Sequence, residues 1–388
     1  MRFSQRTPHD LSLNSISKAL ELVPSASLLD LTQSNPTQCG FNYPPDLLKA
    51  LASPSALKYE PIPFGHPEAR STLAAYLRSK GQEVSPENIL LTSSTSEAYS
   101  YLFKLLADPD DSFLVPTPGY PLLDHLLRLE GVDFIPYSRK AEPLWPVDLE
   151  SLPTGLEKRV KGLVVVNPHN PTGTFLSAED QKALGRLCRQ KDWAYISDEV
   201  FGEFANPGET IPVWIPQEAL TFRLGGLSKS LGLPQLKLSW VILDGPRELL
   251  AEARERLELI ADTYLSVGTP VQLAIQDLLG FGPSFQKQLM ERVLLNRDYL
   301  IKALKDSPLV KVWPAQGGWY ALLEVLKPGE KDDELVIQLL DQEEVFIQPG
   351  GFYDFATGCF LVVSLLPQPG VFQDAIGRMA GFFAKKGL

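Results

Sequence analysis

Cysteine and clusters of basic residues are scarce in this sequence, and each scarcity excludes a class of protein. The three cysteines, Cys39, Cys188 and Cys359, are odd in number and widely spaced, with no CxxC pair and no spacing typical of metal ligands. They predict a chain without a metal site in a reducing compartment, the cytoplasm. The net charge of −11, with no basic cluster, argues against a nucleic-acid partner, because such a partner presents a phosphate backbone.

Long apolar runs are absent as well. No stretch reaches the ~18 consecutive apolar residues of a transmembrane helix, so we expect no membrane partner. Residues 1–15 lack the apolar core of a signal peptide. The 33 prolines are scattered through predicted loops rather than gathered in a linker. The 388 residues, 44% of them hydrophobic, therefore indicate an ordinary globular protein whose length suits two or three domains.

Short predicted strands alternate with helices through the middle of the chain. This alternation predicts parallel βαβ units, and hence an α/β fold with a wound sheet covered by helices on both faces. The runs FLVP (113–116) and LVVV (163–166) are continuously apolar. Such runs are typical of parallel strands buried on both faces, whereas half-exposed strands alternate apolar with polar residues.

The pattern changes after Pro246. Long helices follow, and the few strands beyond them appear in an antiparallel arrangement. We therefore predict a large α/β domain over residues 46–285. Residues 1–45 and 286–388 are predicted to form together a smaller α+β domain.

Polar residues follow several predicted strands, at the edge where open parallel sheets bind ligands. Ser94, Thr95 and Ser96 come between a strand and a helix, where hydroxyls and backbone N–H groups can hold an anion. A plain N-cap is the alternative role for them. Tyr120, between two prolines after the next strand, could stack on a flat ligand or pack in the interior.

Three further groups lie at the ends of the following strands. The turn NPHNPTG (167–173) offers the amide of Asn167 or Asn170, although either could simply hold the turn. Asp198 ends a buried strand and needs a partner, which could be a cationic ring nitrogen, a helix N-terminus or a salt bridge. Lys229 follows two glycines and lies between two serines. It is either a surface charge or an amine held in a site.

Together these groups match the parts of one cofactor. The hydroxyl residues at the helix N-terminus fit the phosphate of pyridoxal phosphate, and Tyr120 fits its ring. The asparagine amide fits the phenolic oxygen, Asp198 the pyridine nitrogen and Lys229 the aldehyde. A carboxylate paired with the pyridine nitrogen favours the electron sink that stabilises a carbanion. Lys229, after forming a Schiff base with the cofactor, could then move a proton as general base.

Seven motifs along the chain also resemble those of a known family. They are, in order, KYEPIPFG, TSSTSEA, PTPGYP, NPHNPTG, SDEVFGEF, LSKSLGLPQLKLSW and GGWYALL. The resemblance covers nearly the whole length of the chain. In these motifs the chain resembles the class I/II aminotransferases, the aspartate aminotransferase-like group of fold type I pyridoxal-phosphate enzymes. The resemblance implies a large domain with a mostly parallel, seven-stranded wound sheet, and a smaller α+β domain.

The resemblance also assigns roles to individual residues. It implies that Lys229, Asp198 and Tyr120 are catalytic, with Lys229 carrying the Schiff base, Asp198 pairing with the pyridine nitrogen and Tyr120 stacking on the ring. Tyr59 would reach the phosphate of a neighbouring subunit, which implies a homodimer with shared sites. The remaining residues implied to bind the cofactor are Ser94, Thr95, Ser96, Asn170, Phe201, Ser228 and Lys237.

Three of the cofactor positions depart from the usual family pattern. Phe201 stands where many relatives have a tyrosine whose hydroxyl touches the phenolic oxygen. Gly226 replaces a common serine and so removes a phosphate donor. Lys237 replaces an arginine, which keeps the charge and loses the bidentate geometry. These departures predict a retuned cofactor site rather than a lost one.

The largest departure concerns the substrate. When the chain is aligned on Ser364, Val362 stands where the family usually has the arginine that binds the substrate α-carboxylate. Either another group binds that carboxylate, or the substrate has none at this place. The candidates for substrate contact are Asn35, Lys58, Arg297, Trp319 and Tyr320, together with Val362 itself.

Three functions remain open at this point. The first is an aminotransferase that moves an amino group from an amino acid or amine to a 2-oxo acid by a ping-pong mechanism. The second is another pyridoxal-phosphate reaction on the same fold, either decarboxylation or C–S/β-elimination, which the missing arginine favours. The third is a non-catalytic protein that binds the cofactor, a role disfavoured by the retention of Lys229 with Asp198.

Overall fold

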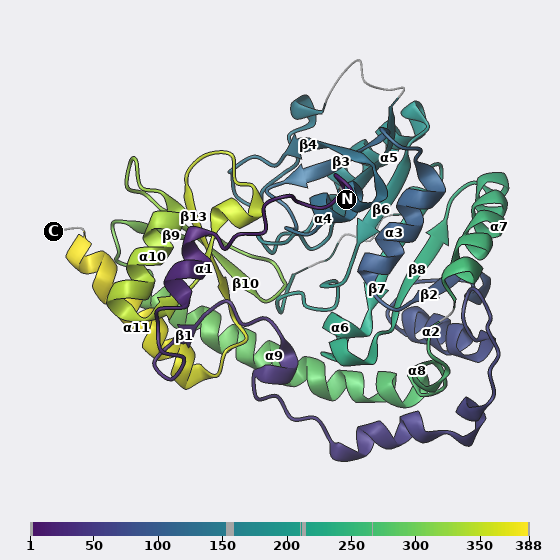
Figure 1. Ribbon diagram of the computed structural model, residues 1–388, viewed down its shortest axis with the longest axis horizontal. Helices are drawn as coiled ribbons and strands as arrows, with labels where there is room; N and C mark the ends of the chain where they lie inside the picture. Colours follow the sequence, from purple (N-terminus) through teal and green to yellow (C-terminus); the bar gives the residue numbers. More distant parts are fainter. Residues whose placement is uncertain (1–2, 153–158, 210, 212–214, 266, 387–388) are drawn as a thin grey trace.

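A mixed seven-stranded sheet forms the centre of the larger part of the molecule (Figure 1). The computed structural model describes residues 3–152, 159–209, 211, 215–265 and 267–386. The order of the strands across the sheet is β2-β8-β7-β6-β5-β3-β4. Strands β7, β6, β5, β3 and β4 are mutually parallel, and β8 runs antiparallel to both of its neighbours. The predicted α/β class and the mostly parallel seven-stranded sheet are confirmed.

The strands of this sheet are β2 (Ile89–Thr92), β3 (Ser112–Thr117), β4 (Asp133–Ser138), β5 (Val160–Val166), β6 (Ala194–Asp198), β7 (Thr221–Gly226) and β8 (Ser239–Asp244). The helices along the chain are α1 (Ser15–Leu20), α2 (Pro67–Ser79), α3 (Thr95–Leu106), α4 (Leu123–Glu130), α5 (Ala178–Lys191), α6 (Leu227–Ser230), α7 (Arg247–Tyr264), α8 (Thr269–Leu273), α9 (Ile275–Leu304), α10 (Asp332–Glu343) and α11 (Pro369–Lys386). Short 3₁₀ helices cover Pro36–Gln38, Pro45–Ala52, Pro54–Leu57, Pro86–Asn88, Leu149–Ser151, Pro234–Leu236 and Gly350–Tyr353.

Both faces of the sheet are covered, as its continuous apolar strands predict. In β6, Ile196 packs in the same cluster as residues of α3, α4 and α7, whereas Tyr195 packs on the other face with Leu184 of α5. Successive side chains of a strand point to opposite faces, so this alternation extends along the strand. It places Asp198 on the face that α3 covers, and Ser197 on the opposite face.

A second, four-stranded sheet lies beside the first, at the left of Figure 1. Its order is β12-β13-β10-β9, and all of its pairs are antiparallel, as the tail of the sequence predicts. Its strands are β9 (Val310–Val312), β10 (Tyr320–Val325), β12 (Gln348–Pro349) and β13 (Cys359–Ser364).

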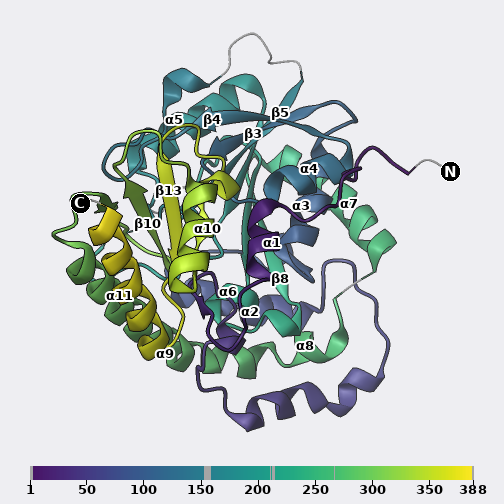
Figure 2. The ribbon, with the colours of Figure 1, turned by 60° about the vertical axis from the view of Figure 1, so that its left-hand side comes forward.

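The N-terminal segment joins this second part of the molecule. Strand β1 (Leu29–Asp30) pairs in parallel with β11 (Val345–Phe346), and α1 packs against α10 (Figure 2). These contacts join the N-terminal segment to the C-terminal part of the chain; the division into domains of residues 46–285 and of residues 1–45 with 286–388 stays a prediction. The predicted boundary at residue 285 falls inside α9, a continuous 30-residue helix that runs beneath both parts in Figure 1.

One predicted helix differs in type. The segment PPDLLKALAS folds as a 3₁₀ helix over Pro45–Ala52. Its apolar residues Leu47, Ala50 and Leu51 are only partly buried against the core, so packing gives little preference for the wider α-helix.

Candidate active site

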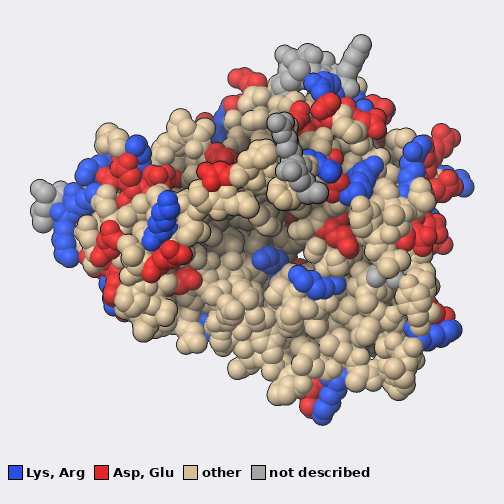
Figure 3. Space-filling view, viewed as in Figure 1, with Lys and Arg blue, Asp and Glu red and all other residues tan. Residues whose placement is uncertain are grey.

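A cavity of about 260 Å³ opens where the carboxyl ends of β5, β6 and β7 meet the second sheet. Figure 3 shows the surface hollowed near the centre of this face, between the part that carries β13 and the part that carries α3. Lys or Arg side chains lie along the hollow. The cavity is lined by Ser34, Thr95, Tyr120, Val166, Asn170, Asp198, Val200, Phe201, Gly226, Ser228, Lys229, Ser239 and Tyr320. Seven of the sequence-predicted cofactor residues therefore meet here.

Lys229 lies in the short helix α6, directly after β7. Its Nζ atom is 5.1 Å from the ring centroid of Trp319 and 5.7 Å from that of Phe201. The two rings meet edge to face, with centroids 4.9 Å apart. Burial lowers the pKa of Lys229, and the negative charge of Asp198 opposes that shift. A lowered pKa enlarges the fraction of neutral amine, the form that can act as nucleophile or base.

Asp198 is the last residue of β6 and is only 5% exposed. Its Oδ2 accepts a hydrogen bond from the hydroxyl of Tyr99 at 3.0 Å, and its Oδ1 accepts one from the backbone N–H of Val200 at 3.2 Å. Burial raises the pKa of Asp198 to about 6, against the effect of both hydrogen bonds. The carboxylate is therefore ionised near neutral pH and aimed at the cavity.

Asn170 and Tyr120 lie on the same cavity. The Oδ1 atom of Asn170 is buried and has no hydrogen-bond partner among the described residues. Since buried polar atoms are nearly always paired, this amide is suited to a ligand. Burial, and then the charge of Asp198, raise the pKa of Tyr120 to about 12, so its phenol stays neutral.

The hydroxyl residues at the start of α3 divide into two roles. Ser94 is the N-cap, and its Oγ accepts a hydrogen bond from the N–H of Glu97 at 3.1 Å, which is the alternative role considered from the sequence. Thr95 is the first residue of the helix and lines the cavity, whereas Ser96 does not line it. The free N–H groups and the dipole of this helix end favour an anion beside Thr95.

Besides Ser94 and Ser96, two predicted cofactor residues are not among those that line the cavity. Lys237 is exposed and has a left-handed backbone conformation (φ 52°) after a 3₁₀ helix. Tyr59 is 73% exposed, which suits a residue that contacts a second copy of the chain rather than its own site.

The substrate candidates are spread over different surroundings. Tyr320 lines the cavity. Trp319 does not line it, but its ring lies beside the amine of Lys229. Asn35 is an N-cap whose Oδ1 is bonded to the N–H and hydroxyl of Thr37. Lys58 forms an exposed ion pair with Glu60.

Val362 and Arg297 are not among the residues that line the cavity. Val362 is completely buried in an aromatic cluster with Trp145, Leu322 and Tyr353. Arg297 is buried and donates hydrogen bonds to Asn206 and to the backbone of the loop before β10. The position aligned with the family arginine is therefore filled by apolar packing, and Arg297 supports the loop that carries Trp319 rather than facing a substrate.

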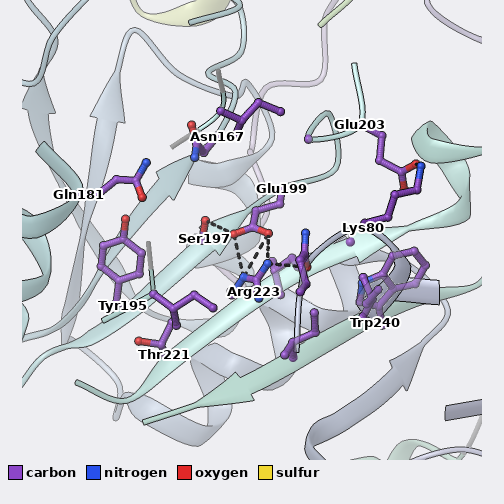
Figure 4. A pocket seen from close by; sticks show the side chains of 18 of the residues that line it. Lys80, Asn167, Gln181, Tyr195, Ser197, Glu199, Glu203, Thr221, Arg223 and Trp240 are labelled. Atoms are coloured by element: carbon purple, nitrogen blue, oxygen red, sulfur yellow. Dashed lines mark hydrogen bonds and ion pairs between the residues drawn. The ribbon is translucent and has the colours of Figure 1, made fainter. Parts of the chain in front are cut away.

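A charged network behind β6 holds the end of that strand in place (Figure 4). The carboxylate of Glu199 accepts bonds from Nε and Nη2 of Arg223 at 3.0 and 2.9 Å, and from the Ser197 hydroxyl at 3.0 Å. Arg223 also donates to Gln82 at 2.7 Å. A bidentate pair of this kind is geometrically rigid. It fixes the backbone next to Asp198 from the face opposite to α3.

Three polar residues of the site were not predicted from the sequence. They are Ser34 and Ser239, which line the cavity, and Tyr99, which donates to Asp198. Tyr99 lies one turn inside α3, where its ring follows the apolar pattern of the helix. Only the helical spacing from Thr95 to Tyr99, which puts both on one face, could have indicated it.

Replacing Tyr99 with phenylalanine is expected to lower kcat/KM about tenfold and to move the acidic limb of its pH profile upward. The lost O–H donor stabilises the ionised form of Asp198, and a hydrogen bond to a charged group contributes about 1.5–3 kcal/mol. Without it the pKa of Asp198 rises further, so higher pH is needed to ionise the carboxylate.

Tyr137→Phe is the matched control for that substitution. Tyr137 is also a buried phenol, and it donates to the backbone oxygen of Val164 at 2.9 Å. Both variants lose one buried hydrogen bond, but only Tyr99→Phe should shift the pH profile measured from pH 5 to pH 9. Identical profiles for the two variants would reduce Tyr99 to a packing role.

The fold and this site define a class I/II aminotransferase. The family model for aminotransferase class I and II matches residues 26–363, and the chain belongs to that family, as its motifs predict. The chain is 26% identical over 368 residues to the glutamate-pyruvate aminotransferase AlaA of Haemophilus influenzae, covering 92% of this chain and 91% of the relative. It is also 26% identical to the alanine aminotransferase of Mycobacterium tuberculosis, covering 92% and 85%.

Solved structures agree with this family. Alanine aminotransferase from Pyrococcus furiosus superposes with a TM-score of 0.88 at 25% identity, covering 99% of this chain and 100% of that chain. A single mutant of the aspartate aminotransferase from Thermus thermophilus superposes with a TM-score of 0.83 at 25% identity, covering 98% of this chain and 100% of that chain. The predicted aminotransferase activity is that of the family, and family and fold imply pyridoxal phosphate as the cofactor.

No helix among the described residues is both long and apolar enough to cross a membrane.

Proposed function

We propose that this chain binds pyridoxal phosphate in the cavity beside Lys229 and transfers an amino group from an amino acid to a 2-oxo acid. The observation that carries the proposal is the convergence of Lys229, Asp198 and the unpaired amide of Asn170 on one cavity. Each matches a different part of the cofactor, and no single ordinary structural role accounts for all three.

The residues present fit the cofactor. Asp198 would pair with the ring nitrogen, the amide N–H of Asn170 would donate to the phenolic oxygen, and Thr95 and Ser228 would bind the phosphate, while Tyr120 would lie against the ring. When bound, the cofactor supplies an electron sink for the carbon from which a proton is removed. Lys229 then holds or moves that proton, since it lines the cavity and its amine has a lowered pKa.

In this reaction the protein itself contributes a residue, Lys229, that accepts and returns a proton in a largely buried site. The rings of Phe201 and Trp319 lie beside the amine of Lys229, and the negative charge of Asp198 favours the protonated form of that amine. The balance between burial and Asp198 keeps the pKa of Lys229 below its ordinary value. This suits a group that must both accept and return a proton in each half-reaction.

We also propose a homodimer in the cytoplasm. The exposed Tyr59 supports the dimer, because it matches the family tyrosine that reaches a neighbouring site. The location is supported by the three buried free cysteines, which suit a reducing compartment.

The test is a half-reaction. Purified protein loaded with pyridoxal phosphate would be mixed with single donors, including alanine, glutamate, tyrosine, cysteine and amines without a carboxylate, while the cofactor spectrum and released products are recorded. We expect one equivalent of 2-oxo acid per site and stoichiometric conversion of the cofactor to its amino form. Release of carbon dioxide or sulfide with the cofactor returned unchanged would instead indicate the decarboxylase or lyase alternative. Failure of the protein to bind the cofactor would overturn the proposal.

A further inference from the structure

Gly226 and Ser239 are paired at the last position of the β7–β8 register, and both line the cavity. Gly226 has φ 177° and ψ 158°, an extended conformation that any residue can adopt. The backbone therefore does not require glycine at this position, and the reason must lie in its surroundings.

The surroundings of Gly226 are filled by the side chain of Ser239. A Cβ atom built on Gly226 would lie 2.3 Å from Oγ and 3.0 Å from Cβ of Ser239. The Ser239 hydroxyl thus occupies the space into which a side chain at position 226 would point. Many members of the family have a serine at the position of Gly226, and glycine there removes that phosphate donor.

Ser239 is placed to act on a ligand rather than on the protein. It is 1% exposed, it lines the cavity with Thr95, Ser228 and Lys229, and its hydroxyl has no hydrogen bond to another residue in the described part of the chain. By contrast, the nearby hydroxyl of Ser230 donates to the backbone oxygen of Gly226 at 2.8 Å.

We propose that Ser239 binds the phosphate of the cofactor, and that its hydroxyl replaces from β8 the donor that β7 lacks at Gly226. The inference rests on the proposed function, since it requires the cofactor to lie in this cavity. Positions 226 and 239 together then determine which strand supplies the hydroxyl that binds the phosphate. A serine is tolerated at either position, but not at both, because the two side chains would overlap.

The test measures affinity rather than activity. Cofactor-free protein would be titrated with pyridoxal phosphate and, separately, with pyridoxal, which lacks the phosphate. A hydrogen bond to a charged group contributes about 1.5–3 kcal/mol, so Ser239→Ala should weaken binding of pyridoxal phosphate by about 10- to 100-fold. Binding of pyridoxal should change less than about twofold, because the lost donor faces only the phosphate.

A double variant that exchanges the residues at positions 226 and 239 tests the same role if a single variant folds poorly. Gly226→Ser alone should weaken phosphate-dependent binding, because its Cβ overlaps Oγ of Ser239. The double variant Gly226→Ser with Ser239→Gly should recover most of the affinity, since the hydroxyl returns from the other strand. Ser230→Ala is the control, and it should treat the two ligands alike.

The outcomes separate the inference from the proposed function. A wild-type protein that binds neither ligand overturns both. A wild-type protein that binds pyridoxal phosphate, with Ser239→Ala binding it equally well, overturns only the role of Ser239. Equal losses for pyridoxal phosphate and pyridoxal in Ser239→Ala would also overturn it, because the hydroxyl would then support the cavity wall instead of the phosphate.

Discussion

Replacing Lys229 with alanine is expected to lower the rate of both half-reactions by about a thousandfold or more. A positioned acid–base group contributes about 10²–10⁴-fold to a rate, and the same amine is the one we expect to hold the cofactor. Lys229 is the only lysine that lines the described cavity, and its lowered pKa depends on that burial. No neighbouring lysine on the wall can take its place.

Two variants sharpen this prediction. Lys229→Arg keeps the positive charge but has no amine that can lose a proton near neutral pH, so its rate should fall as far as that of the alanine variant. Lys161→Ala, which removes a half-buried lysine paired with Asp111 and does not touch the cavity, should leave the rate unchanged. Single-turnover rates measured by rapid mixing provide the comparison. A Lys229→Ala rate within about tenfold of wild type would exclude the lysine from the chemistry.

Much of the fold and part of the site could be predicted because the relevant signals are local. Continuous apolar runs reveal the buried strands, and each polar residue directly after a parallel strand must lie at the same sheet edge. Lys229, Asp198 and Asn170 were found by that rule, and the structure places all three on one cavity.

The same rule did not predict Ser239, and the reason is physical. It is the first residue of β8, and β8 is antiparallel, so its amino end rather than its carboxyl end lies at the ligand edge. Neither the direction of β8 nor its insertion between β2 and β7 is encoded in a local pattern, because both depend on pairing between strands distant in the chain. Once the Gly226–Ser239 register is known, the hydroxyl is evident.

Val362 illustrates a different limit. Aligning a strand by one serine predicts which residue stands at a position, but not whether its side chain reaches the site. Val362 pairs with Leu322 on the neighbouring strand and is covered by Trp145 and Tyr353. These contacts come from three separate segments, so they depend on how the two parts of the molecule pack. A role for Val362 in substrate binding would require this cluster to open.

Replacing Asp198 with asparagine is expected to have opposite effects on activity and on the stability of the cofactor-free protein. Activity should fall by about a hundredfold or more, because the pyridine nitrogen loses its anionic partner and charge stabilisation of this kind contributes about 10²–10³-fold. Asparagine can still accept one hydrogen bond from Tyr99 or Val200, so the site should keep its shape. Asp198→Ala, which leaves both donors unpaired, is the matched comparison.

The stability effect follows from the direction of the pKa shift. The folded-state pKa of Asp198 is raised to about 6, above an unfolded value of about 3.9, so ionisation of the carboxylate opposes folding. This cost is absent below about pH 4, grows between about pH 4 and 6, and reaches about 3 kcal/mol above that range. Removing the charge should therefore stabilise Asp198→Asn relative to wild type at pH 8, and much less at pH 4.

Chemical denaturation of the cofactor-free proteins at both pH values measures the difference. An equal change in unfolding free energy at the two pH values would mean that Asp198 does not titrate in the folded protein as its burial requires. Together with lost activity, the predicted pattern would show that the chain retains a buried charge at the expense of stability because the reaction needs it.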